Sequence, residues 1–223
     1  MKVFFGILVL APLIFCLDAQ RMPNGPKEKR SRKTETKITI AYLLDGNEFK
    51  KEDAARNSTV GKWLNKIQEK AQKKLKKDLN MEIKFKITDI NITDDDLTHK
   101  ITYWSSDRLL HASTYLNHLK KSYQNRVNSD IICVLTNYTM YDEDLVGYLA
   151  YIEHQTLCQS MVPILLTYNP GDVAQTGKFL SELVKKSTSS KEVKLQKRAI
   201  RKCNTKNEKV TNIKSRKSMR PSI

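Results

Sequence analysis

The chain has 223 residues and a formal net charge of +16, and 39% of its residues are hydrophobic while 29% are charged. This composition fits one globular domain with solvated ends and excludes a collagen, a coiled coil and a repeat array. The one apolar run long enough to suggest a membrane is at the extreme N-terminus, so no transmembrane anchor is expected.

The N-terminus has the features of a secretory signal peptide. Lys2 precedes an apolar run from Val3 to Leu17, and Ala19 supplies a small residue at the cleavage point. We therefore expect residues 1–19 to be removed and the mature protein to be secreted into an oxidising, extracellular space. Three Asn-X-Ser/Thr sequences agree with secretion and are candidate N-glycosylation sites: Asn57, Asn91 and Asn137.

A basic segment follows at residues 20–37. It carries seven Lys or Arg against two Asp or Glu, for a net charge of +5, and it has no apolar cluster that could anchor it. This composition predicts disorder. The run Lys29–Arg32 is also a candidate processing site, although basic runs are more often simply solvated.

The next segment alternates strand and helix patterns. Residues 38–44 form a β-rich apolar run that ends at the turn residues Asp45–Asn47. Apolar residues then recur at helical spacing from Val60 to Leu75, with lysines on the other sides, which predicts a long amphipathic helix. Residues 81–87 alternate between apolar and charged, as in a strand at the edge of a sheet.

Three consecutive carboxylates, Asp94–Asp96, suggest a calcium loop at first sight. Their spacing lacks the alternate ligands and the glycine of an EF-hand loop, so we expect a helix start or a loop instead. Ser105–Asp107 are predicted to cap a second helix that extends to about Val127.

The remaining pattern completes the fold prediction. Strands are expected at 130–136, 146–151 and 161–168, followed by a helix through Val184 that Asn169–Asp172 introduce. The order predicts an α/β fold with a mixed, mostly parallel five-stranded sheet and flanking helices. The expected domain covers residues 38–186, between two basic disordered tails.

The cysteines permit at most one bridge within the mature chain. Cys16 belongs to the signal peptide, and Cys133 lies in an apolar run where a free cysteine behaves as a small buried hydrophobe. This favours a disulfide between Cys158 and Cys203. The alternative is a bridge between two chains through Cys203.

The C-terminal tail, 187–223, is strongly basic. Residues 185–223 contain 14 Lys or Arg and two Asp or Glu, for a net charge of +12. Such a segment binds polyanions by counterion release, and for a secreted protein these are glycosaminoglycans or acidic surfaces rather than genomic nucleic acid. No aromatic side chain interleaves with the charges to stack on bases. The candidate polyanion-binding residues are Lys194, Lys197, Arg198, Arg201 and Lys202.

Residues 38 to about 186 resemble the reprolysin-type zinc metalloproteases of the metzincin clan, especially the short secreted members found in tick saliva. The resemblance is carried by Leu43–Asp45 with Phe49, by Ser129–Thr136, and by Gly147–Tyr151 with Cys158 downstream. It implies that the second string is a central strand and the third an antiparallel edge strand that lines a substrate cleft. It also implies a bridge from Cys158 to a cysteine near the end of the domain, in agreement with Cys203.

The family's zinc motif, His-Glu-x-x-His-x-x-Gly-x-x-His, is degenerate in this chain. Its best placement starts at Ser181, so that Glu182 is the only remnant, while Lys185 and Lys191 stand where two histidines are required. A catalytic zinc needs three neutral donors and an open position for water. We therefore expect no catalytic residue, no metal site and no cofactor.

The sequence thus predicts a non-catalytic, metalloprotease-like binding scaffold whose partners are a host extracellular protein or peptide and polyanionic glycans or surfaces. The alternative is an active zinc metalloendopeptidase with an atypical site built from His111, His118 and His154. A third interpretation is a truncated or frame-altered product, because the patterned helix gives way to a lysine-rich tail just where the zinc site should be.

Overall fold

The computed structural model describes residues 35–126, 128–143 and 145–204. The predicted signal peptide, nearly all of the predicted segment 20–37 and the chain after residue 204 lie outside this part. Within it, no helix is both long enough and apolar enough to span a membrane.

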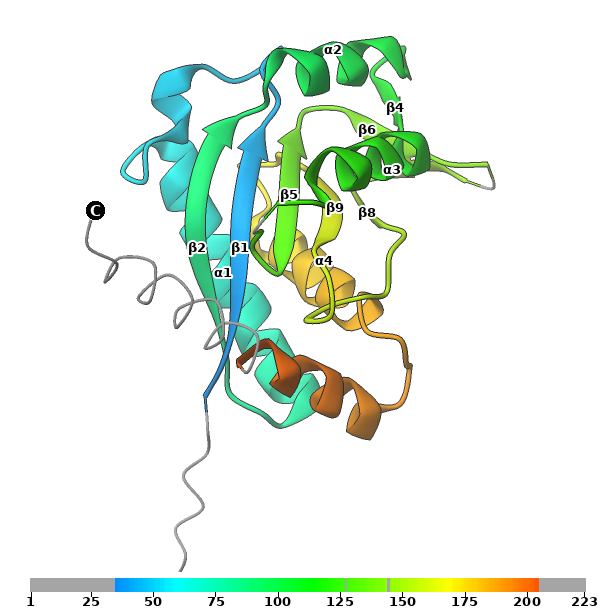
Figure 1. Ribbon diagram of the computed structural model, residues 1–223. Coiled ribbons are helices and arrows are strands. Elements are labelled where there is room, and N and C mark those ends of the chain that lie inside the picture. Colours follow the sequence, from blue (N-terminus) through cyan, green and yellow to red (C-terminus); the bar gives the residue numbers. More distant parts are fainter. Residues whose placement is uncertain (1–34, 127, 144, 205–223) are drawn as a thin grey trace, which may run out of the picture. The chain divides into compact units, whose positions relative to one another are not determined.

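Five strands form one mixed, mostly parallel sheet, which confirms the predicted fold class (Figure 1). Their order is β2-β1-β5-β9-β8; the first four are parallel, and the edge strand β8 is antiparallel to β9. The bounds are Ile83–Ile92 for β2, Thr36–Leu44 for β1, Ile131–Thr136 for β5, Val162–Thr167 for β9 and Ala150–Ile152 for β8.

Helices cover both faces of this sheet, so β5 and β9 are buried along their whole length. Helices α1 (Thr59–Leu79) and α4 (Val173–Lys186) pack on one face, and α2 (Asp95–Tyr103) and α3 (Ala112–Tyr123) pack on the other. A short 3-10 helix at Lys51–Ala54 precedes α1.

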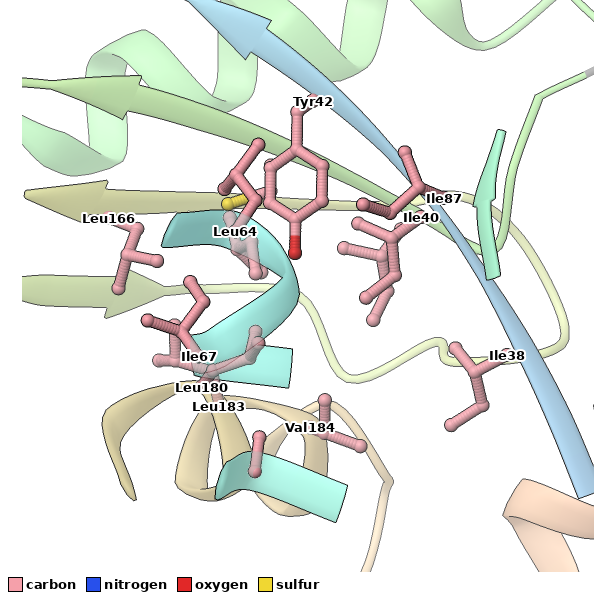
Figure 2. Packing of buried hydrophobic residues seen from close by; sticks show 14 of the residues in the cluster. Ile38, Ile40, Tyr42, Leu64, Ile67, Ile87, Leu166, Leu180, Leu183 and Val184 are labelled. Carbon is pink, nitrogen blue, oxygen red and sulfur yellow. The ribbon is translucent and has the colours of Figure 1, made fainter. Parts of the chain in front are cut away.

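The larger core lies between the sheet and the pair α1 and α4. Figure 2 shows Tyr42 of β1 among apolar side chains from the sheet and α1. Burying a hydroxyl is costly unless it is hydrogen-bonded. The Tyr42 hydroxyl meets this requirement by accepting a bond of 2.9 Å from Nε2 of Gln68, a buried residue of α1.

The predicted helix from Ser105 to Val127 is wrong at its start. Ser105–Ser106 form β3, which pairs with β4 (Leu109–His111), and α3 begins only at Ala112. Asp107 and Arg108 have φ of 50° and 62°, as a two-residue hairpin turn requires. A tight turn therefore occupies the place of the predicted helix cap.

The acidic run has the helix-start role that was predicted. Asp94 is the N-cap of α2, and its side chain accepts a bond of 2.9 Å from the Leu97 N–H. Helix α2 itself was not predicted, because its nine residues are too few to show a clear apolar period.

The single strand predicted at 146–151 is two strands in different sheets. β7 (Val146–Tyr148) pairs with β6 (Thr139–Tyr141) in a small sheet that also contains β3 and β4, whereas β8 pairs with β9. The chain changes sheet near Gly147, whose φ of 93° suits glycine. The expected antiparallel edge strand is therefore only Ala150–Ile152.

The packed chain continues past the boundary predicted at residue 186. Residues 193–204 are helical, and Gln196, Ile200 and Cys203 are buried on one side of this helix. Asn204 at its end accepts a bond of 2.9 Å from the Lys37 N–H at the start of β1. The first part of the predicted disordered tail is thus a docked helix, which we call the C-terminal helix.

The disulfide between Cys158 and Cys203 is present, as predicted. It ties the C-terminal helix to the turn that follows β8, and the chain between the two cysteines spans 45 positions. The free cysteine, Cys133, is fully buried in β5, and burial raises the pKa of its thiol. A buried, protonated thiol is inert, so the bridge within the chain leaves no reactive cysteine among the described residues.

Candidate functional site

The end of α4 lies where the resemblance places the zinc-binding helix, but its side chains serve other purposes. Ser181 is buried and donates a bond of 2.8 Å to the Lys178 carbonyl. Lys185 forms an ion pair of 2.5 Å with Asp78 of α1, which locks the two helices together. Lys74 pairs with the same carboxylate at 2.9 Å, and these two cations lower the pKa of Asp78. Ser181 and Lys185 occupy the two positions on this helix from which the family's histidines bind zinc. The first side chain is bonded to the backbone and the second is in an ion pair.

This set of residues does not fit a catalytic zinc. Lys185 and Lys191 stand at two of the three histidine positions and would bring positive charge to the place of the zinc cation. Ser181 stands at the third, and its hydroxyl already donates to the backbone. Among the described residues, no group of three His, Cys, Asp or Glu side chains is placed to hold a metal ion.

The three histidines of the alternative zinc site have separate roles. His111 is the N-cap of α3, where its Nδ1 accepts from the Thr114 N–H at 3.4 Å. His118 pairs with Asp96 at 2.7 Å, and its ring packs edge-on against Trp104. His154 lies in the chain after β8. The alternative therefore gains no support from the positions of these side chains.

The surroundings of His154 indicate that the stability of the folded protein depends on pH. Its Nε2 is buried without a hydrogen-bond partner, and burial, followed by the nearby charge of Lys120, lowers its pKa, against a smaller opposite effect of Glu153. In the unfolded chain His154 therefore gains a proton below about pH 6.5, whereas its surroundings in the folded protein oppose this protonation. The free energy of unfolding accordingly decreases as the pH is lowered. In thermal melts at pH 7.5 and 5.5, His154→Gln should lose less stability on acidification than the wild type. Equal losses would contradict this role.

A cleft of about 740 Å³ opens between the end of α4, the end of β8 and the chain that leads into the C-terminal helix. Its apolar lining residues are Leu79, Ile152 and Val193. Its walls carry three lysines, three carboxylates and several polar side chains: Lys185, Lys186, Lys191, Asp78, Glu153, Glu182, Gln155, Thr188, Ser189, Ser190 and Gln196. The volume is typical of small-molecule sites. Glu182 and Lys191, the predicted motif positions, both line it.

The five predicted polyanion-binding residues lie on the side of the C-terminal helix that is opposite its buried side. At 100° per residue, Gln196, Ile200 and Cys203 fall on one stripe, and the cations fill the other half of the helix. Lys197 is half-buried and the others are exposed: Lys194, Arg198, Arg201 and Lys202. Residues 193–204 contain no Asp or Glu. We call this surface the basic face.

The charges of the basic face were predicted from the sequence, but the helix that carries them was not. The signal was present, because Gln196, Ile200 and Cys203 are spaced by four and three residues, as on one side of a helix. The density of lysines around these positions, and the polar Gln196 among them, concealed this narrow buried stripe.

β8 presents an open edge beside the cleft. Leu149 accepts a bond of 2.9 Å from the Thr167 N–H, so the antiparallel pattern directs the N–H and C=O groups of Ala150 and Ile152 away from β9. At the opposite edge of the sheet, the side chains of Gln72 and Arg56 cover β2 by bonding to its backbone. β8 is therefore the edge that favours addition of an extended segment.

The three candidate glycosylation sites differ in exposure. Asn57, before α1, and Asn91, near the end of β2, are exposed. Asn137 is partly buried between β5 and β6, and its Nδ2 donates to Glu48 at 3.1 Å. Glycans at all three remain a prediction, and the first two have the more open surroundings.

Comparisons with known proteins give only structural similarities. No protein-family model matches the sequence, and neither does any curated protein. The chain is similar to the crystal structure of archaemetzincin from Methanopyrus kandleri, with a TM-score of 0.39 and 12% identity, over 81% of this chain and 96% of that one. It is also similar to metalloproteinase-II from Bacteroides fragilis, with a TM-score of 0.43 and 9% identity, over 77% of this chain. It spans 54% of the Bacteroides chain.

Proposed function

We propose that this protein is a secreted, non-catalytic binding scaffold that attaches to sulfated glycosaminoglycans through the basic face. The carrying observation is the docked C-terminal helix, which presents Lys194, Arg198 and Arg201 together on one exposed side. A docked helix has already lost its conformational freedom, so binding does not have to order it. The disulfide that fixes this helix supports secretion, because such bridges persist in oxidising compartments.

The scaffold is proposed to derive from a reprolysin-like metalloprotease, of the branch found in tick saliva, that has lost its metal. The sheet order and the antiparallel edge strand β8 support this origin. The absence of zinc chemistry is supported by Ser181 and Lys185, whose contacts are incompatible with metal ligation.

The open edge of β8 favours a second partner, an extended peptide of a host extracellular protein. Strand addition uses the outward backbone groups of Ala150 and Ile152 and needs no metal.

The glycosaminoglycan proposal predicts a steep salt dependence. Each lysine or arginine that neutralises a sulfate releases a counterion, so the affinity for heparin should fall with a slope of about −3.5 to −4.5 in log K against log salt if five cations take part. Isothermal titration at several NaCl concentrations measures this slope. A slope near zero, or binding to phosphatidylserine vesicles with none to heparin, would contradict the proposal.

A further inference from the structure

The cleft beside the basic face has a mixed charge that a simple polyanion site would not have. Three of its lining residues are carboxylates, Asp78, Glu153 and Glu182. Asp78 is compensated by Lys74 and Lys185. The other two carboxylates form no ion pair within the described residues, and a bare polyanion that entered the cleft would meet their repulsion.

The polar groups of the cleft match an acidic sugar. An ionised carboxylate only accepts hydrogen bonds and has about four acceptor sites, so Glu182 suits the hydroxyl donors of a pyranose. The oxygens of Glu153 accept from Asn117 Nδ2 at 3.2 and 3.1 Å and keep further acceptor sites for such a donor. Lys186 and Lys191 line the same cleft and suit a sulfate or a uronic carboxylate. Ile152 and Val193, the apolar lining residues with exposed surface, offer contact to the C–H groups of a sugar ring.

The cleft and the basic face are continuous. Val193 of the C-terminal helix lines the cleft and is four residues before Lys197 of the basic face, so these two side chains are neighbours on the helix surface. A glycan that follows the basic face therefore reaches the mouth of the cleft with one end.

We propose that the cleft binds the terminal acidic sugar residue of the glycan that the basic face holds. This inference rests on the proposed function and gives it a selectivity: the cleft accepts a sulfated oligosaccharide and rejects a polyanion without hydroxyl groups, such as linear polyphosphate. The basic face attracts any polyanion at long range, and Glu153 and Glu182 discriminate a sulfated oligosaccharide from a polyanion without hydroxyl groups.

The test uses Glu153→Ala/Glu182→Ala with two ligands of similar charge, a heparin-derived hexasaccharide and linear polyphosphate. Removal of two negative charges should leave polyphosphate binding unchanged or tighter. The same variant should bind the hexasaccharide about tenfold more weakly, because it loses two acceptors of sugar hydroxyls. Titration calorimetry in 0.15 M NaCl measures both affinities, and circular dichroism checks the fold.

Glu52→Ala/Glu69→Ala is the matched control, because it removes two exposed carboxylates that do not line the cleft. The control should leave the preference for the hexasaccharide intact. If both ligands bind more tightly to the cleft variant, charge alone governs binding and the inference is overturned. If the wild type binds neither ligand, the proposed function fails instead.

Discussion

Replacing four cations of the basic face by glutamine is expected to remove most of the affinity for heparin. The variant carries Lys194→Gln, Lys197→Gln, Arg198→Gln and Arg201→Gln. At roughly 1 kcal/mol for each cation beside a polyanionic surface, the affinity at 0.15 M NaCl should fall at least a hundredfold. The slope of log K on log salt should also become shallower by about 3, because four fewer counterions are released. Titration calorimetry or a heparin column measures both effects.

A scattered variant with the same loss of charge separates the site from the total charge. Lys51, Lys62, Lys86 and Lys121 are exposed and lie on the 3-10 helix, α1, β2 and α3 respectively. Their replacement by glutamine should weaken heparin binding only slightly. Equal losses in the two variants would show that net charge, rather than the basic face, drives binding.

Removal of the disulfide is expected to destabilise the protein by about 4 kcal/mol. The bridge closes a loop across 45 positions, and loop-closure entropy in the unfolded chain gives this figure for that length. Urea unfolding of Cys158→Ser/Cys203→Ser measures the loss. It is a large part of the 5–15 kcal/mol that is usual for a whole domain.

Chemical reduction supplies the control for this prediction. Dithiothreitol should destabilise the wild type to the level of the double variant and leave the variant itself unchanged. A wild type that is insensitive to the reductant while its bridge is shown to be reduced would contradict a stabilising role for the disulfide.

The central sheet was predictable because its sequence signals are strong and independent. β5 and β9 are short, unbroken apolar runs, as is typical of parallel strands that are covered on both faces. α1 repeats its apolar positions over 21 residues, enough to define a helical period. Long periodic elements therefore reveal their type without any knowledge of tertiary contacts.

Elements fixed by tertiary contacts were missed. The turn at Asp107 and Arg108 needs positive φ at both residues without glycine, so its sequence reads equally well as a helix cap. The C-terminal helix was taken for a disordered tail because its buried stripe of Gln196, Ile200 and Cys203 contains one polar residue. This helix is also bridged to Cys158, which is distant in sequence.

The candidate site was predictable only in its parts. Glu182, Lys191 and the basic residues were each identified from the sequence, but the cleft that joins the first two with β8 arises from packing. The ion pair between Lys185 and Asp78 joins positions 107 residues apart, so no local sequence pattern predicts it.

Zinc content of the purified protein is the measurement that most directly separates a binding scaffold from an enzyme. Protein supplied with zinc during purification is analysed by elemental mass spectrometry, together with a peptide-cleavage assay with and without chelator. Because Ser181 and Lys185 are engaged in other contacts, we expect far less than one zinc per chain and no cleavage that a chelator abolishes. One zinc per chain with chelator-sensitive cleavage would contradict a non-catalytic scaffold and establish an atypical metalloendopeptidase.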